Sequence, residues 1–178
     1  FIEQYKDKPF FLYVSFNATH APARSSDHWR DKLAHIEKKK LAKAAQVAEL
    51  DEAIGTVMKS LKDHDLVSDT LIFCLADNGR SDFSGGLNGL EGSNGLRGDK
   101  WETWEAGIRV PWIVQWEGRI PAGVVIDEPV IQLDILPTAL AAAGSDEGQF
   151  DGLNLLPLME GAVSTLKKRP LYWRVASQ

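Results

Sequence analysis

Two oxygen-bearing side chains, Asp77 and Asn78, come directly after an apolar run, residues 70–76, that has the composition of a buried strand. In open α/β sheets, ligands gather where strands end at their carboxyl edge, so polar chemistry is expected here. A carboxylate and an amide oxygen are donors that Ca²⁺ or Mg²⁺ prefers. The same residues, followed by Gly79, are also typical of an ordinary turn, so this pattern alone does not decide between a metal site and a turn.

His20 and Lys100 are the other two candidates for chemistry. His20 follows an apolar run, residues 9–16, just as Asp77 follows its own, and a parallel β-α-β unit would bring both to one sheet edge. A histidine there can protonate a leaving oxygen, although a loop histidine can also simply hydrogen-bond locally. Lys100 lies in a glycine-rich stretch, where its ammonium group suits an oxyanion, although most lysines are only solvated.

The elements that must position these residues are predicted from periodicity. Apolar positions at steps of three and four predict a helix over 34–63, and Asp134 is expected to cap a helix that stops at Gly144. The pattern as a whole favours an α/β fold with a mostly parallel sheet and covering helices. Strands are expected at 9–16, 70–76 and 109–116, with shorter ones at 129–133 and 170–175.

The bulk composition excludes several classes. A net charge of −5 and a pI near 5.4 argue against a nucleic-acid partner, and the apolar runs are too short to span a membrane. A single cysteine, Cys74, rules out an intramolecular disulfide and is expected to be a small buried thiol. The chain opens on Phe1 and enters a strand within nine residues, so we interpret it as a segment of a larger protein.

Taken in order, the motifs along nearly the whole chain resemble the C-terminal part of the catalytic domain of type I, formylglycine-dependent sulfatases, in the alkaline phosphatase-like superfamily. The resemblance implies an incomplete sulfatase-like α/β domain over 1–178, with about 150–178 leading toward a C-terminal subdomain. The matching pieces include Lys8-Pro-Phe-Phe-Leu-Tyr13, Asn17-Ala-Thr-His20, Asp77-Asn78-Gly79, Leu96-Arg-Gly-Asp-Lys100, Gly107-Ile-Arg-Val-Pro111, Gln132-Leu-Asp-Ile-Leu-Pro-Thr138 and Asp151-Gly152.

The resemblance implies a role for each candidate residue. Asp77 and Asn78 match two ligands of the family's single Ca²⁺ site, and His20 and Lys100 match the His and Lys that contact the sulfate ester. His20 would then donate a proton to the leaving alcohol. The implied activity is hydrolysis of sulfuric esters, with a sulfated small molecule or glycan as substrate. Family membership also suggests an extracytoplasmic parent protein, although the sequence does not specify the compartment.

The family's nucleophile motif, Cys or Ser followed by x-Pro/Ala-x-Arg, does not occur in this sequence, and the formylglycine is expected upstream. Ca²⁺ takes six to eight oxygen ligands, and two obvious ones are present. We therefore predict that the chain alone is inactive. We also predict that it self-associates through strand edges that a missing N-terminal part would cover.

Two alternatives remain open at this stage. A phosphatase or phosphodiesterase of the same superfamily would share the sheet, but two-metal members place a histidine where Asn78 stands and use another downstream. Here no histidine follows His64, which disfavours a site that needs nitrogen ligands. The other alternative is a non-catalytic segment that only binds an anionic glycan.

Overall fold

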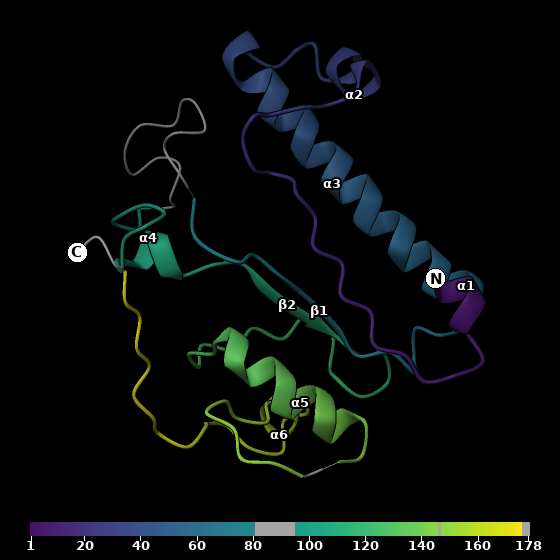
Figure 1. Ribbon diagram of the computed structural model, residues 1–178, viewed down its shortest axis with the longest axis vertical. Helices are drawn as coiled ribbons and strands as arrows, with labels where there is room; N and C mark the ends of the chain where they lie inside the picture. Colours follow the sequence, from purple (N-terminus) through teal and green to yellow (C-terminus); the bar gives the residue numbers. More distant parts are fainter. Residues whose placement is uncertain (81–94, 146, 176–178) are drawn as a thin grey trace. The chain divides into compact units, whose positions relative to one another are not determined.

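The structure, a computed structural model, describes residues 1–80, 95–145 and 147–175 (Figure 1). The chain divides into two compact units. The first comprises residues 1–66, 76–111 and the segment from 173 onward, and the second comprises residues 67–75 and 112–172. The candidate residues all belong to the first unit, and each unit is described by itself below.

The first unit is built along one long helix, α3 (Lys38–Asp63), which confirms the helix predicted over 34–63 (Figure 1). Two short helices contact it, α1 (Ile2–Tyr5) and α2 (Asp27–Lys32). Helix α2 was not predicted from the sequence. It is held by side chains rather than by an apolar stripe, because Ser26 N donates to Glu49 Oε1 at 2.7 Å and Trp29 Nε1 to Glu52 Oε2 at 2.8 Å.

The buried face of α3 differs from the predicted apolar stripe at one turn. Val47, one of the apolar positions on which the helix prediction rests, is 48% exposed, whereas Ala45 and Gln46 are buried. The extended chain around residues 16–22 packs on this face, and its backbone carbonyl groups need hydrogen-bond donors. A polar residue therefore lies where periodicity alone favours a hydrophobic one.

The second unit contains the sheet. Strands β1 (Ile72–Leu75) and β2 (Trp112–Gln115) form inside the predicted runs 70–76 and 109–116, and they pair antiparallel. The predicted parallel arrangement is wrong for this pair. Between them, the described residues hold only one helical turn, α4 (Glu105–Ile108), and not a helix long enough for a crossover to a parallel strand.

The remaining predicted strands do not form ladders within the described residues. Residues 9–16, 129–133 and 170–175 carry no strand, and the sheet has only β1 and β2. A strand is defined by the backbone hydrogen bonds of a neighbour, so apolar, β-branched sequence without such a neighbour stays extended but unpaired. The strand predictions for these three runs are therefore wrong within the described residues, and residues 132–133 lie instead in a 3₁₀ turn.

The core of the second unit lies on β2 and two helices, α5 (Ile135–Ala142) and α6 (Leu156–Met159). Trp116 is at its centre, with its indole Nε1 donating to Ser68 O at 2.8 Å. The helix predicted to run from Asp134 to Gly144 is confirmed as α5, preceded by the 3₁₀ turn η3 (Gln132–Asp134). Buried Leu155, Leu156 and Met159 pack against Trp116.

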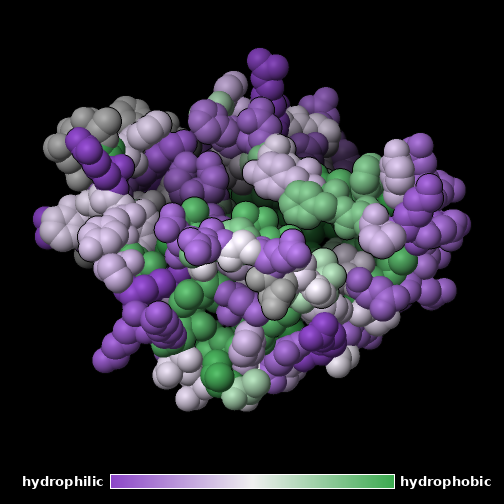
Figure 2. Space-filling model, turned by 60° about the horizontal axis from the view of Figure 1, so that its bottom comes forward, coloured by the Kyte–Doolittle hydropathy of each residue, from purple (hydrophilic) through white to green (hydrophobic). Residues whose placement is uncertain are grey.

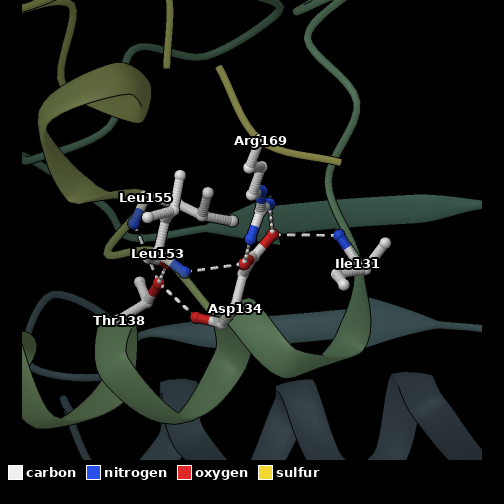
Figure 3. Close-up of polar contacts among 6 residues, drawn as sticks. All are labelled: Ile131, Asp134, Thr138, Leu153, Leu155 and Arg169. Atoms are coloured by element: carbon white, nitrogen blue, oxygen red, sulfur yellow. Dashed lines mark hydrogen bonds and ion pairs between the residues drawn. The ribbon is translucent and has the colours of Figure 1, made fainter. Parts of the chain in front are cut away.

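Asp134 has a different role from the helix cap that the sequence suggested (Figure 3). Its carboxylate is fully buried and accepts hydrogen bonds from Nη1 and Nη2 of Arg169, each at 2.5 Å. It also accepts the backbone N–H groups of Ile131 at 2.9 Å and Leu153 at 2.8 Å. Gly152 permits this approach, since a Cβ there would lie 1.9 Å from Leu133 O. One carboxylate therefore joins three separate segments of the second unit.

Part of the surface is apolar (Figure 2). Phe11, Tyr13, Val125 and Tyr172 are each more than three-quarters exposed. Cys74, expected to be buried, is an exposed free thiol, because it lies on the outward-facing side of β1. None of the helices in the described ranges has the length and apolar character that a membrane span requires.

Candidate functional site

The oxygen-rich corner follows β1 after a single residue. Asp77 is exposed and Asn78 is half-buried. The Asn78 amide nitrogen donates to Gly79 O at 2.7 Å, which turns the amide oxygen Oδ1 to the opposite side. The corner therefore presents a carboxylate and an amide oxygen from adjacent residues, and both are hard donors.

The corner is fixed by close packing against residues 97–107. Gly79 N donates to Gly107 O at 2.9 Å, and a Cβ on Gly79 would lie 1.9 Å from Ala106 O. Gly107 is equally constrained, since a Cβ there would lie 2.1 Å from Glu102 O. Only glycine fits at both positions, so the two segments meet backbone to backbone.

A backbone hydrogen bond positions Lys100 next to the segment that follows Asp77 and Asn78. Its N–H donates to Arg80 O at 2.6 Å and lies 2.7 Å from Asp99 Oδ1. The surrounding loop is closed by Ala106 N, which donates to Arg97 O at 2.8 Å. The structure thus places a half-buried lysine beside the segment that carries Asp77 and Asn78.

His20 lies in the loop that packs on α3. The ring Nδ1 is 2.7 Å from Ala21 O, and because a carbonyl oxygen only accepts, Nδ1 carries the hydrogen. The other ring nitrogen, Nε2, is then the one able to exchange a proton with a ligand. Among the described hydrogen bonds and ion pairs, none joins His20 to Asp77, Asn78 or Lys100.

Two residues of α3 hold the His20 loop, and the sequence analysis did not single them out. Lys43 Nζ donates to Thr19 O, and Gln46 Nε2 donates to His20 O at 3.0 Å. Burial lowers the pKa of the Lys43 ammonium group. The available signal was a pair of polar residues three apart inside a helix rich in alanine and leucine, a pattern that a solvated face gives equally well.

A hollow of about 430 Å³ lies between this loop and α3. Gln46 is 6% exposed, and its Oε1 has no hydrogen-bond partner within the described residues. A buried acceptor without a partner is unfavourable, so this part of the hollow suits a polar ligand or water. The residues lining it include Asn17, His20, Arg24, Gln46, Glu49 and Leu50.

Asp77 and Asn78 are suitable in donor chemistry for a hard divalent cation. Both supply oxygen, and the orientation of Asn78 leaves Oδ1 as an acceptor. Two ligands fill part of a calcium coordination sphere, and within the described ranges no group of three or more His, Cys, Asp or Glu side chains could hold a metal. The residues present fit part of a calcium site.

Comparison with known proteins identifies relatives. The family model described as Sulfatase matches residues 1–145. Arylsulfatase H of Canis lupus familiaris is 38% identical over 174 residues, covering 92% of this chain and 29% of the relative. N-acetylgalactosamine-6-sulfatase of the same species is 37% identical over 178 residues, covering 96% of this chain and 32% of the relative. The chain spans less than a third of the length of these curated relatives.

Solved structures give the same result for the fold. Ps i-CgsB, in complex with k-i-k-neocarrahexaose, matches with a TM-score of 0.75 and 33% identity over 85% of this chain and 33% of that one. A phosphonate monoester hydrolase from Silicibacter pomeroyi matches with a TM-score of 0.51 and 28% identity over 75% of this chain and 23% of that one. The predicted fold class, a partial alkaline phosphatase-like α/β domain, is confirmed.

Proposed function

The chain belongs to the sulfatase family, and on that premise we propose that it forms part of an enzyme that hydrolyses sulfate esters. The observation that carries the proposal is the placement of Lys100. Its backbone N–H bonds to Arg80 O, within the segment that follows Asp77 and Asn78. The backbone of a lysine suited to a sulfate oxygen is therefore bonded to the segment that carries two oxygen ligands suited to a metal.

In the proposed site Asp77 and Asn78 would hold calcium together with further ligands that this chain does not supply. The bound ion would supply positive charge that polarises the sulfate group. A formylglycine nucleophile would also have to come from outside this chain, since the sequence lacks the motif that generates it. These two requirements underlie the expectation that the chain alone is inactive.

The chain's own residues bind the sulfate and move a proton. The Lys100 ammonium group pairs with a sulfate oxygen as charge develops there. With Nδ1–H held by Ala21 O, the imidazolium form of His20 carries its second proton on Nε2. It donates that proton to the leaving alcohol oxygen and becomes a neutral imidazole. Gln46 and Lys43 fix the loop from which His20 acts.

The substrate class is proposed from the relatives. Their names include an N-acetylgalactosamine-6-sulfatase, and Ps i-CgsB was solved with a carrahexaose. A sulfated glycan is therefore the first natural substrate to test, with a small aryl sulfate as the general probe.

The test uses the full-length protein that contains this chain and measures sulfate release from 4-nitrophenyl sulfate. Activity should be lost on chelation, return with Ca²⁺, and be lost in Asp77→Ala. Asp69→Ala is the matched control, because Asp69 is an exposed carboxylate before β1 rather than after it. Activity that survives both chelation and Asp77→Ala would refute the metal assignment.

The likeness to a phosphonate monoester hydrolase supports one alternative, a phospho-ester hydrolase. The corner argues against it, because Asn78 supplies an amide oxygen where two-metal chemistry favours a nitrogen ligand. Faster hydrolysis of 4-nitrophenyl phosphate or bis(4-nitrophenyl) phosphate than of the sulfate would favour the alternative. Glycan binding with no hydrolysis of any of these esters would favour a non-catalytic role.

A further inference from the structure

Trp101 has a backbone conformation that a tryptophan rarely adopts. Its φ is +75°, in the left-handed region, and its side chain is 67% exposed. This conformation is sterically unfavourable for a bulky residue, whereas glycine adopts it readily. Strain of this kind persists only where the surroundings enforce it, and it is concentrated at functional sites.

The backbone on both sides of Trp101 is held in place. Lys100 N donates to Arg80 O at 2.6 Å, and Glu102 N donates to Asp99 O at 3.0 Å. The backbone that carries the exposed indole is therefore held next to the proposed sulfate-binding lysine. The Lys100 Nζ atom lies 5.3 Å from the centroid of the Trp101 ring.

A second pair of the same kind lies in the same loop. The Arg97 guanidinium carbon lies 3.7 Å from the ring centroid of Trp104, which is 47% exposed. Arg97 therefore covers one face of Trp104, whereas Trp101 presents more open indole surface. The loop combines two cations with two aromatic rings, a composition complementary to a ligand that has both anionic groups and apolar ring faces.

We propose that Trp101 determines specificity by stacking against a pyranose ring of a sulfated glycan whose ester sulfate is held by Lys100. The C–H faces of a pyranose carry slight positive charge and pack on the electron-rich face of an indole. An open platform flanked by hydrated cations suits a sugar that keeps its hydroxyl groups in water. A large apolar alcohol would instead require an enclosed cleft. This inference rests on the proposed function and adds the class of the leaving group.

The test compares Trp101→Gly with wild type in the full-length protein. Glycine relieves the φ of +75°, so the variant should fold with an unchanged or higher thermal midpoint. We expect kcat/KM for a carrageenan or chondroitin sulfate hexasaccharide to fall about tenfold or more, as for loss of a stacked ring. Hydrolysis of 4-nitrophenyl sulfate, whose leaving group is one small ring without sugar units, should fall by a smaller factor than hydrolysis of the hexasaccharide. Trp101→Phe should retain most of the glycan activity.

The matched control is Asp65→Gly. Asp65 is the other described non-glycine residue with positive φ, at +56°, and it lies just beyond α3, outside the site. It should alter stability without changing the preference between the two substrates. Equal loss of both activities in Trp101→Gly, or an unchanged glycan activity, would overturn the proposal.

A binding measurement separates this inference from the proposed function. Calorimetric titration of the hexasaccharides into His20→Ala protein, with and without Trp101→Gly, reports the platform without turnover. Weaker binding in the double variant supports the platform, even if no sulfate ester is hydrolysed. Equal affinity of the single and double variants, or no measurable binding by the His20→Ala protein, overturns the stacking proposal. It does so even if the wild-type protein cleaves 4-nitrophenyl sulfate and the proposed function holds.

Discussion

At the scale of single residues, Asp134 shows how a side chain can be essential to the fold without chemistry. It accepts four hydrogen bonds, two of them from Arg169, whose side chain is only 15% exposed (Figure 3). Removing one partner of a buried pair leaves a polar or charged group without compensation. The ion pair therefore stabilises the fold because both partners are present and hydrogen-bonded, and not because of their charges alone.

We predict that Asp134→Asn destabilises the full-length protein by about 3–5 kcal/mol, because Arg169 would lose its ionised partner in a buried site. The measurement is the free energy of unfolding in denaturant. Glu160→Gln is the matched control, since Glu160 also pairs with an arginine, Arg119, at 2.5 Å but nearer the surface. The control should cost less than about 1 kcal/mol. Similar effects of the two substitutions would contradict the assignment.

The same pair gives a pH dependence whose sign follows from its bonds. Burial raises the pKa of Asp134, but hydrogen bonds from Arg169, Ile131 N and Leu153 N outweigh it, so this pKa lies below its ordinary value. Its stabilisation is therefore complete above the pKa of an unfolded aspartate and is lost as the pH falls through the folded value. Wild type should lose more stability than Asp134→Asn as the pH falls below about 4.

At this scale, the sequence indicated which residues could have a function, but it did not indicate which residues they contact. Asp77 and Asn78 stand out because two oxygen donors follow a strand-like run, and Lys100 stands out because it lies in a glycine-rich stretch. Gln46 does not, because its significance comes from a carbonyl group 26 residues earlier. Asp134 was noticed as a helix cap, but its partner Arg169 lies 35 residues away, and no local pattern encodes that contact.

At the scale of elements, the close approach of two backbone segments positions Lys100 beside the corner. We predict that Gly79→Ala lowers stability by about 1–3 kcal/mol, because the new Cβ would meet Ala106 O at 1.9 Å. The same displacement should lower sulfate-ester hydrolysis by about tenfold or more, since it moves the corner relative to Lys100.

Gly55→Ala is the control for that substitution. Gly55 lies within α3, and a Cβ there would meet nothing within 4 Å. Alanine should raise helix stability by about 0.5–1 kcal/mol and leave the activity unchanged. If Gly79→Ala behaves like Gly55→Ala, the packing of the corner does not control activity.

The hold of α3 on the His20 loop gives a second prediction for the elements. Gln46→Leu keeps the side chain's bulk but removes the donor to His20 O, so the loop loses one of its two bonds to α3. We expect kcat to fall about tenfold or more with a smaller change in KM, because His20 acts on the leaving group.

Thr56→Ala is the comparison on the same helix. Its Oγ1 donates to Glu52 O at 3.0 Å at an exposed position, without contact to the His20 loop. This variant should retain wild-type kinetics. A Gln46→Leu enzyme with an unchanged kcat would show that the loop keeps its position without this bond.

Elements with a strong local pattern were predictable, and those that depend on distant partners were not. The long apolar periodicity of α3 and the strand types of β1 and β2 specify these elements from nearby residues alone. The direction of the β1–β2 pair depends instead on the path of residues 76–111, which has little periodicity. Residues 9–16 have strand composition, yet strand formation requires a neighbour that no local pattern supplies.

At the scale of the whole molecule, order along the chain was more informative than any single motif. Each short match is common by itself, but the same sequence of matches is improbable by chance, and the family comparison agrees with it. The structure divides the chain into two units, which composition did not indicate. Linear order is visible in a sequence, whereas the grouping of distant segments into units requires their contacts.

Self-association of the isolated 178-residue chain is the prediction for the whole molecule. The two-stranded sheet has two outer strand edges, and a two-stranded ladder is marginal by itself. Exposed apolar side chains add to this, with Tyr13 at 79% and Val125 at 85%. Multi-angle light scattering after size exclusion should therefore give a mass above 19.7 kDa that rises with concentration. If the full-length protein remains monomeric, the association comes from surfaces that are exposed only in the isolated chain. A sharp monomer peak with one cooperative melt would instead mean that the described contacts suffice for an independent fold.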